Sequence, residues 1–346
     1  MSKDLIELLT QADDLNASDL HLTVGIPPTF RINGQLQTFD EQKLLPDDLQ
    51  RIVLQAIPEF RRAEFEEKRE LDFNYSLPNR CRFRMNAYHQ RNSLTLAARK
   101  IDAVIPTIES LNMPNVLYDL CKKPQGLILV TGPTGSGKST TLAAMIDYIN
   151  QTQAKHIITL EDPIEYLHGH QMSIVNQREV GSDTKTFANG LRAALRQDPD
   201  IILVGEMRDL DTISTAITAA ETGHLVMATL HTSSAPTTID RIIDVFPPHQ
   251  QGQIRIQLAN VLQGIISQRL FKRVDQTGRI AATEVLTHTS SISNLIRNDK
   301  VHQIANILQT SKALGMHTLE SSIQKLLSER KIDFETAKVH LNTGDY

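Results

Sequence analysis

The segment from residue 126 to residue 150 constrains the fold of this chain more than any other. Four consecutive apolar residues, Leu127 to Val130, are typical of a strand buried on both faces of a sheet. A glycine-rich break follows, and a helical pattern resumes from Lys138 to about Asn150. The break contains the pattern Gly-x4-Gly-Lys-Ser, which predicts a phosphate-binding loop when it joins a strand to a helix. The alternative is a chance glycine-rich turn.

Each residue type in this loop has a physical role in binding a nucleoside triphosphate. Glycines let the backbone curl so that successive N–H groups point at phosphate oxygens, and the following helix adds its positive N-terminal end. We expect Lys138 to bridge the β- and γ-phosphates of ATP and the Ser139 hydroxyl to bind Mg²⁺. The predicted nucleotide-binding residues are Gly132, Pro133, Thr134, Gly135, Ser136, Gly137, Lys138, Ser139 and Thr140.

Composition sets broad bounds on the class of protein. The 346 residues suffice for two domains, and the formal net charge of −4 gives no general attraction to nucleic acid or anionic lipid. Cys81 and Cys121 match neither a zinc spacing nor a disulfide framework, which favours a reducing compartment. No segment approaches the ~18 apolar residues of a membrane span, so we expect docking at a membrane rather than insertion.

The patterns before and after residue 100 differ, which predicts two domains. Residues 1–100 resemble a small α+β domain, in which turns are expected at Asn33-Gly34 and Pro78-Asn79. Residues 101–115 are the predicted linker. From residue 116 to 346 an α/β domain with a parallel sheet is expected, with short helices from about residue 289. Its predicted strands are Leu127–Val130, His156–Leu160, Ile201–Val204 and Leu225–Leu230.

A carboxylate follows the predicted strand Ile201–Val204, where a Walker B element is expected. The usual Asp of that element is Gly205 here, and the acid comes one residue later, at Glu206. Glu206 is therefore expected to orient the attacking water rather than to hold the metal. The alternative is an exposed glutamate at the end of a strand.

A second acidic stretch follows the strand His156–Leu160. Glu161, Asp162 and Glu165 place three carboxylates within five residues, and their mutual repulsion is costly unless a cation lies nearby. We expect Mg²⁺ with its waters to neutralise them, with Glu161 and Asp162 supporting the metal and Glu165 the water. The alternative is a solvated acidic loop.

Histidine and arginine side chains supply candidates for sensing and stabilising the transferred phosphate. His231 follows the strand Leu225–Leu230 and is expected to contact the γ-phosphate, although a surface or core histidine is the common alternative. Period-two alternation puts Arg82 and Arg84 on one face of a predicted N-terminal strand. In a ring of subunits this face would reach a neighbour's nucleotide; a solvated strand face is equally compatible with the pattern.

These motifs, in this order, resemble the hexameric ATPases of the secretion superfamily, which serve type IV pili and type II secretion. Within that superfamily the pilus retraction ATPases are similar to this chain nearly from end to end. The resemblance identifies Glu206 as the catalytic carboxylate and explains the missing Asp. The matching motifs are Walker A (132–140), the Asp box (158–165), an atypical Walker B (205–209), the His box (223–232), and the stretches 17–22, 82–87, 238–247 and 315–319.

The resemblance also implies an architecture and partners. It implies an N-terminal PAS-like domain, a C-terminal RecA-like ATPase domain, and a homohexamer in which Arg82 and Arg84 face nucleotide bound between the domains. The protein would then be a cytoplasmic, Mg²⁺-dependent ATPase docked at the inner membrane against a polytopic platform protein. A paralogous retraction ATPase is a further expected partner, and no direct contact with nucleic acid is expected.

Two departures from the retraction ATPases keep alternatives open. The family's retraction motif, usually Ala-Ile-Arg-Asn-Leu-Ile-Arg, lacks its first Arg in the stretch Ser291–Arg297, and residues 88–92 are closer to an accessory retraction paralogue. A RecA-like nucleic-acid translocase is the alternative from another class. The acidic net charge and the absence of Trp oppose it.

Overall fold

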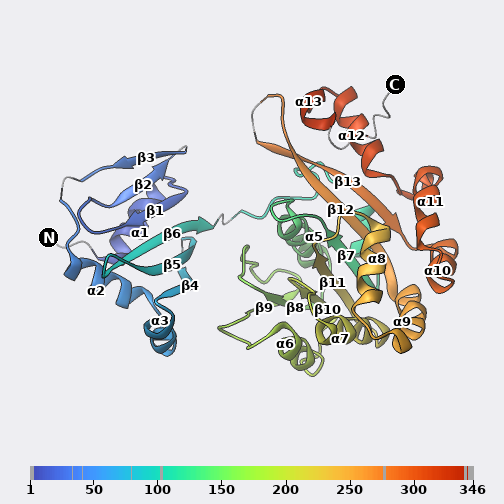
Figure 1. Ribbon diagram of the computed structural model, residues 1–346, viewed down its shortest axis with the longest axis horizontal. Helices are drawn as coiled ribbons and strands as arrows, with labels where there is room; N and C mark the ends of the chain where they lie inside the picture. The colour runs from blue at the N-terminus through green and yellow to red at the C-terminus, as the bar shows by residue number, and fades with distance from the viewer. Residues whose placement is uncertain are drawn as a thin grey trace. The chain divides into compact units, whose positions relative to one another are not determined.

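The computed structural model of the protein describes residues 4–32, 34–40, 42–78, 80–101, 104–275, 278–338 and 341. The chain divides into two compact units, Met1–Val104 and Ile105–Tyr346 (Figure 1). Asn33 and Asn79, each placed in a predicted turn, lie outside the described residues.

The N-terminal unit is an antiparallel sheet with helices packed on one face. Its strand order is β3-β2-β1-β6-β5-β4. The strands are β1 (Asp19–Leu22), β2 (Thr29–Ile32), β3 (Gln35–Thr38), β4 (Glu70–Ser76), β5 (Arg82–Gln90) and β6 (Ser93–Ile101). The helices are α1 (Leu5–Asp14), α2 (Pro46–Ala56), α3 (Arg62–Lys68) and the short 3₁₀ helix η1 (Glu59–Arg61).

Alternation along β5 separates the core of this unit from its open face, as predicted. Phe83, Met85 and Ala87 are fully buried in the apolar core beneath the helices. Arg82 and Arg84 lie on the opposite face. Arg84 stands directly across from Arg99 of β6, and like charges in such a pair are unfavourable in a sheet. Asp19 of β1 accepts from Arg99 Nε at 2.9 Å and offsets part of this repulsion.

The C-terminal unit contains a mainly parallel sheet of order β13-β12-β7-β11-β10-β8-β9. Only the β12–β13 hairpin pairs antiparallel among its described strands. All four predicted strands are confirmed. The strands are β7 (Gly126–Thr131), β8 (His156–Glu161), β9 (Ile174–Glu179), β10 (Ile201–Val204), β11 (Leu225–Leu230), β12 (Leu262–Lys272) and β13 (Arg279–Thr287).

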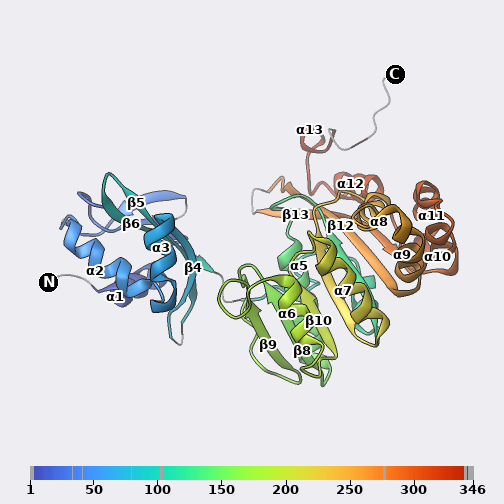
Figure 2. The same ribbon diagram turned by 60° about the horizontal axis from the view of Figure 1, so that its bottom comes forward.

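Helices cover both faces of this sheet, because its central strands are apolar on both sides. Along β7, Ile128 and Val130 pack with α4 and α5, whereas Leu127 and Leu129 pack with α6 to α9. Figure 2 shows α6 and α7 lying over the strands at one side of the sheet. These helices are α4 (Val116–Cys121), α5 (Lys138–Thr152), α6 (Phe187–Ala194), α7 (Leu210–Glu221), α8 (Ala235–Asp244) and α9 (Pro248–Val261).

Short helices follow the sheet, as the sequence predicts for the region after residue 289. Ile323 and Leu326 of α12 are buried against the β12–β13 hairpin. Within the described ranges, no helix is long and apolar enough to cross a membrane. The elements are α10 (Ser290–Arg297), α11 (Ile304–Thr310), α12 (Leu319–Ser328), α13 (Phe334–Ala337) and the 3₁₀ helices η2 (Val301–Gln303) and η3 (Lys312–Leu314).

Several elements differ from the sequence-based expectation. β6, β9 and the β12–β13 hairpin are absent from the prediction. Strand β6 extends to Ile101, at the start of the predicted linker. Ile108 and Met113, which lie within that predicted linker, are buried in the same apolar cluster as α4 and α5.

Candidate active site

Four loops meet at one edge of the C-terminal sheet. They follow β7, β11, β10 and β8, which are neighbours in that order and run parallel. The carboxyl ends of parallel strands share an edge, and ligands bind there in open α/β sheets. The phosphate-binding loop, His231, Glu206 and the acidic stretch from Glu161 are therefore brought together.

The loop after β7 adopts a backbone conformation that only glycine enters without strain. Gly132 has φ 144° and Gly137 has φ 88°. At Gly132 a Cβ atom would lie 2.4 Å from the carbonyl oxygen of Gln268, so a side chain is excluded by space as well. The Lys138 Nζ donates hydrogen bonds to the carbonyl oxygens of Gly132 (2.9 Å) and Pro133 (3.1 Å). This lysine thus closes the loop on itself.

A side chain from β12 fastens the loop to the sheet. Gln268 is 2% exposed; its Nε2 donates to the carbonyl of Ser136 (2.6 Å), and its Oε1 accepts from the hydroxyl of Thr141 (3.0 Å). On the same strand the Ser267 hydroxyl lies 2.8 Å from that of Thr131. Sequence reasoning missed both residues. The available signal is weak, because residues 262–271 include the polar Gln263 and Arg269 beside Ser267 and Gln268.

The loop offers a phosphate group a buried hydroxyl and the N-terminus of a helix. The hydroxyl oxygen of Ser136 is buried, with no hydrogen-bond partner among the described residues. A buried polar atom without a partner is costly, and a phosphate oxygen would satisfy it. The N-terminus of α5 begins at Lys138 and faces the same loop. These features together form a cradle for an anion.

The site also fits Mg²⁺, although side chains alone do not enclose a cation. No group of three or more His, Cys, Asp or Glu residues among those described forms a metal cage. Mg²⁺ bound with a nucleotide keeps several waters and phosphate oxygens, so it needs only one or two oxygen ligands from the protein. Ser139 in the first turn of α5 and the carboxylates after β8 supply such oxygens.

Glu206 is held on both sides by the strands next to β10. The N–H of Gly205 donates to the carbonyl of Leu160 (2.7 Å), and the N–H of Met207 donates to that of Thr229 (3.1 Å). The Glu206 carboxylate, whose side chain is 17% exposed, contacts Arg208 Nε at 2.5 Å and His231 Nε2 at 2.8 Å. Its position is therefore set by backbone and side chains alike.

The charge of Glu206 is stabilised by these two partners. Burial by itself raises the pKa of Glu206, but the hydrogen bond from Arg208 and the electrostatic effects of His231 and Arg208 outweigh it. The net effect lowers the pKa below the ordinary value of 4.5. The group is thus a carboxylate, able to accept a hydrogen bond from water.

Close packing explains why glycine replaces the usual Asp before Glu206. A Cβ atom at Gly205 would lie 3.1 Å from the carbonyl oxygen of Leu160 and 3.3 Å from the Cα of Glu161. Both atoms belong to the backbone of β8, so they yield only if the strand moves. The next acid of the motif, Asp209, accepts the N–H of Thr212 (2.8 Å) and caps α7.

The three carboxylates after β8 have separate surroundings. Glu161 accepts hydrogen bonds from Thr159 Oγ1 (2.6 Å) and Gln177 Nε2 (3.0 Å). Burial raises its pKa, and its donors counter this only in part. The charge of Asp162 acts on Arg208, and that of Glu165 acts on Lys138. The protein's own cations therefore relieve part of the predicted repulsion.

The remaining predicted site residues, Arg82 and Arg84, belong to β5 of the N-terminal unit. His224 begins the return into β11, where its Nδ1 lies 2.9 Å from the carbonyl oxygen of Ala219, at the end of α7. This contact gives His224 a structural role.

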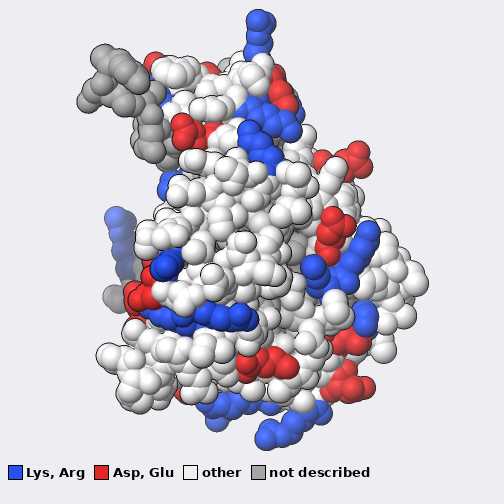
Figure 3. Space-filling view, turned by 90° about the vertical axis from the view of Figure 1, so that its right-hand side faces the viewer, with Lys and Arg blue, Asp and Glu red and all other residues white. Residues whose placement is uncertain are grey.

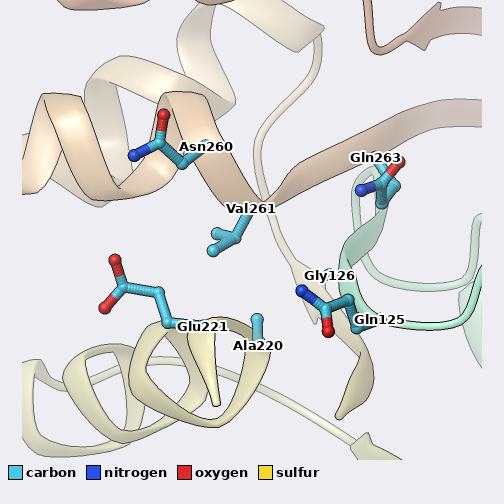
Figure 4. Close-up of a pocket in the computed structure, with 7 residues that line it drawn as sticks. All are labelled: Gln125, Gly126, Ala220, Glu221, Asn260, Val261 and Gln263. Atoms are coloured by element: carbon cyan, nitrogen blue, oxygen red, sulfur yellow. The ribbon is translucent and has the colours of Figure 1, made fainter. Parts of the chain in front are cut away.

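Two pockets differ in their suitability for phosphate. One, of about 260 Å³, lies where β7 and β12 begin, at the opposite ends of the strands from the glycine loop (Figure 4). The amides of Gln125, Asn260 and Gln263 and the carboxylate of Glu221 line it, with no Lys or Arg among its described lining residues. The other, of about 420 Å³, adjoins Glu206 and includes Arg208 and His231. Only the second has the charge for phosphate chemistry.

Comparison with known proteins agrees with this arrangement. Residues 2–337 match the family of type II/IV secretion system proteins. The chain belongs to this family. The Pseudomonas aeruginosa type IV pilus retraction ATPase PilT is 47% identical to this secretion ATPase over 335 residues, which cover 97% of each chain. The type IV pilus ATPase PilU of the same organism is 40% identical and covers 98% of this chain and 89% of its own.

A solved structure extends the likeness to the fold. The crystal structure of the pilus retraction motor PilT with bound ADP has a TM-score of 0.91 at 48% identity, covering 99% of this chain and 98% of that one. The predicted α/β fold and the resemblance to pilus retraction ATPases are thereby confirmed. This secretion ATPase is a nucleotide-binding enzyme that hydrolyses ATP.

Proposed function

We propose that this secretion ATPase is a homohexameric motor that powers type IV pilus retraction. The observation that carries the proposal is the near full-length similarity to a retraction ATPase, together with the convergence of the P-loop, Glu206 and His231 at one edge. The motor would work on the cytoplasmic side of the inner membrane against a platform protein, and twitching motility would depend on it.

The geometry supports a division of labour in hydrolysis. Lys138 and the loop N–H groups hold the phosphates, while Glu206 accepts a hydrogen bond from the attacking water. His231, 2.8 Å from Glu206, links the position of that carboxylate to the γ-phosphate. When bound at Ser139, near Glu161 and Asp162, Mg²⁺ supplies neutralising charge to the phosphates. Burial lowers the pKa of Lys138, and the charges of Glu206 and Glu165 offset part of that effect.

The N-terminal unit would contribute cations to the nucleotide. Arg84 is exposed, and Arg99 rather than an acid faces it across the sheet. Arg99 is engaged by Asp19 at 2.9 Å, whereas the exposed Arg84 side chain is accessible to a nucleotide. We assign Arg82 and Arg84 to stabilising charge on nucleotide within the hexamer, so that hydrolysis moves one unit against the other.

A specific observation also supports an accessory retraction role as second candidate. Ser293 stands where the retraction motif carries its first Arg, and it is 4% exposed. Its hydroxyl donates to the carbonyl of Ala259 (2.8 Å) and lies 3.0 Å from His288 Nε2. Ser293 therefore joins α10 to α9 by a buried hydrogen bond instead of presenting a cation. The similarity to PilU agrees with such a role.

Surface charge opposes a nucleic-acid translocase. Figure 3 shows basic and acidic side chains side by side on the face it presents, separated by broad uncharged areas. A protein that tracks single strands presents a positive groove with stacking aromatic residues. The formal charge of −4 and the absence of Trp point the same way. An ATPase rate that rises on adding DNA and falls with salt would revive this alternative.

The test of the proposal is a count of surface pili in the native host carrying Glu206→Ala as its only copy. A retraction motor gives more surface pili and no twitching, because assembly continues while retraction stops. An accessory role gives an unchanged count with weakened retraction. Loss of pili would contradict both and indicate assembly. Glu221→Ala, at the opposite end of the sheet strands, is the matched control.

A further inference from the structure

The pocket of about 420 Å³ beside Glu206 has features that nucleotide binding does not use. Glu206 and the two residues after it, residues 230–232 and Arg241 line it. No residue of the loop 132–140 is among its described lining residues. The pocket is therefore a space distinct from the phosphate cradle, although Glu206 borders it.

The pair of Glu206 and His231 stands between the two spaces. Both line the pocket, and their side chains lie 2.8 Å apart. On the other side, the charge of Glu206 acts on Lys138, which begins α5. Leu230 packs with α7 and α8, whereas α5 packs on the opposite face of the sheet. The pocket thus opens on the α8 side of the pair.

Arg241 brings an uncompensated positive charge to the pocket. It follows Thr238 by three residues on α8, and the Thr238 hydroxyl lies 2.6 Å from that of Thr232. Helical side chains lean toward the N-terminus, so Arg241 reaches back to the lining loop. It forms no side-chain hydrogen bond or ion pair with any other described residue. The Glu206 carboxylate already pairs with Arg208, so it does not balance the charge of Arg241.

We propose that this pocket is the exit route for inorganic phosphate and that Arg241 binds the phosphate in transit. The inference rests on the proposed hydrolysis at Glu206. Phosphate cleaved from ATP would form next to Glu206 and His231, which both border this pocket, whereas no residue of the described loop 132–140 lines it. An arginine without a partner offers the planar donors that match phosphate oxygens.

Inhibition of the purified full-length ATPase by added inorganic phosphate tests this inference. Arg241→Gln is expected to raise the half-inhibitory phosphate concentration about ten-fold, the loss typical of one charge-assisted hydrogen bond. That change should exceed any change in the KM for ATP several-fold. Arg241→Lys keeps the charge, so its half-inhibitory phosphate concentration should rise roughly three-fold or less. Arg279→Gln, an exposed arginine on β13, should match the wild type.

Three results would overturn the inference. They are unchanged phosphate inhibition in Arg241→Gln, an equal shift in Arg279→Gln, and a shift no larger than that in the KM for ATP. If Arg241→Gln is inactive, equilibrium dialysis of radiolabelled phosphate against the ADP-bound protein replaces the kinetic readout and must show the same loss of affinity. Failure of the proposed hydrolysis at Glu206 is a separate result, because it would appear as normal ATP turnover in Glu206→Gln.

Discussion

Glu161 and Glu206 are the same chemical group at the ends of adjacent strands, yet their surroundings push them in opposite directions. Glu161 is buried among neutral donors, Thr159 and Gln177, and its pKa is raised. Glu206 touches Arg208 and His231, and its pKa is lowered despite burial. Neighbouring strands β8 and β10 thus present two carboxylates with different electrostatics.

The opposite pKa shifts of Glu161 and Glu206 indicate different roles in the site. A carboxylate with a lowered pKa keeps its charge and can accept a hydrogen bond from water during hydrolysis. A carboxyl group with a raised pKa, fixed by neutral donors, is better suited to hold the geometry of the acidic loop or to meet a cation that arrives with the nucleotide. The comparison therefore assigns chemistry to Glu206 and support to Glu161.

The largest expected effect is that of Glu206→Gln. The amide keeps the size of the side chain but cannot act as a base, so kcat should fall about 10²- to 10⁴-fold while ATP still binds. Steady-state ATPase rates and a nucleotide-binding titration check this. Glu221→Gln, a glutamate remote from the nucleotide edge, should retain wild-type turnover.

A smaller loss is expected for Glu161→Gln. The amide oxygen still accepts from Thr159 and Gln177, and burial already disfavours the charged form of Glu161. We expect a fall in kcat of roughly ten-fold, measured in the same assay. If kcat falls as far in Glu161→Gln as in Glu206→Gln, the two carboxylates act as one unit and do not have separate roles.

Removing the partner of Glu206 should change the pH profile more than the maximal rate. Arg208→Gln removes a donor and a positive charge, so that only His231 still opposes the effect of burial, which raises the pKa of Glu206. The carboxylate then protonates at higher pH, so the acidic limb of kcat/KM should move to higher pH. Arg192→Gln breaks the exposed pair with Asp211, 3.0 Å apart, and serves as control. If the acidic limb does not move in Arg208→Gln, protonation of Glu206 is not what sets that limb of the pH profile.

The smallest expected effect is on stability. Thr159→Val preserves shape but removes the hydroxyl that donates to Glu161 at 2.6 Å. The loss of one buried hydrogen bond should cost about 1 kcal/mol in the free energy of unfolding. Urea unfolding of the purified protein measures it, with Thr218→Val on the exposed side of α7 as reference. An equal cost in both variants would mean that Glu161 does not depend on this donor.

Local patterns made much of this architecture predictable. The central strands are apolar runs bounded by glycine or charged residues, and the glycine loop between a strand and a helix has few other interpretations. Alternation on β5 correctly separated Phe83 and Met85 from Arg82 and Arg84. The meeting of the site residues at one edge of the sheet was predictable, because the carboxyl ends of parallel strands share an edge.

The missed features depend on contacts distant in sequence or on unusual turns. The β5–β6 hairpin turns at Arg91-Asn92, both with positive φ, where Asn-Gly is the common signal. Gln268 contacts Ser136 across 132 positions, which no local pattern reveals. The contact of Glu206 with His231 likewise joins the ends of two different strands, whereas its other partner, Arg208, is only two residues away.

The measurement that tests the central claim most directly is the identity of the nucleotide left on Glu206→Gln. The purified variant is incubated with ATP and Mg²⁺, separated from free nucleotide and denatured, and the released nucleotide is identified by chromatography. The account predicts intact ATP on the variant and ADP on the wild type. ADP on both in equal proportion would contradict it, because chemistry would then proceed without the Glu206 carboxylate.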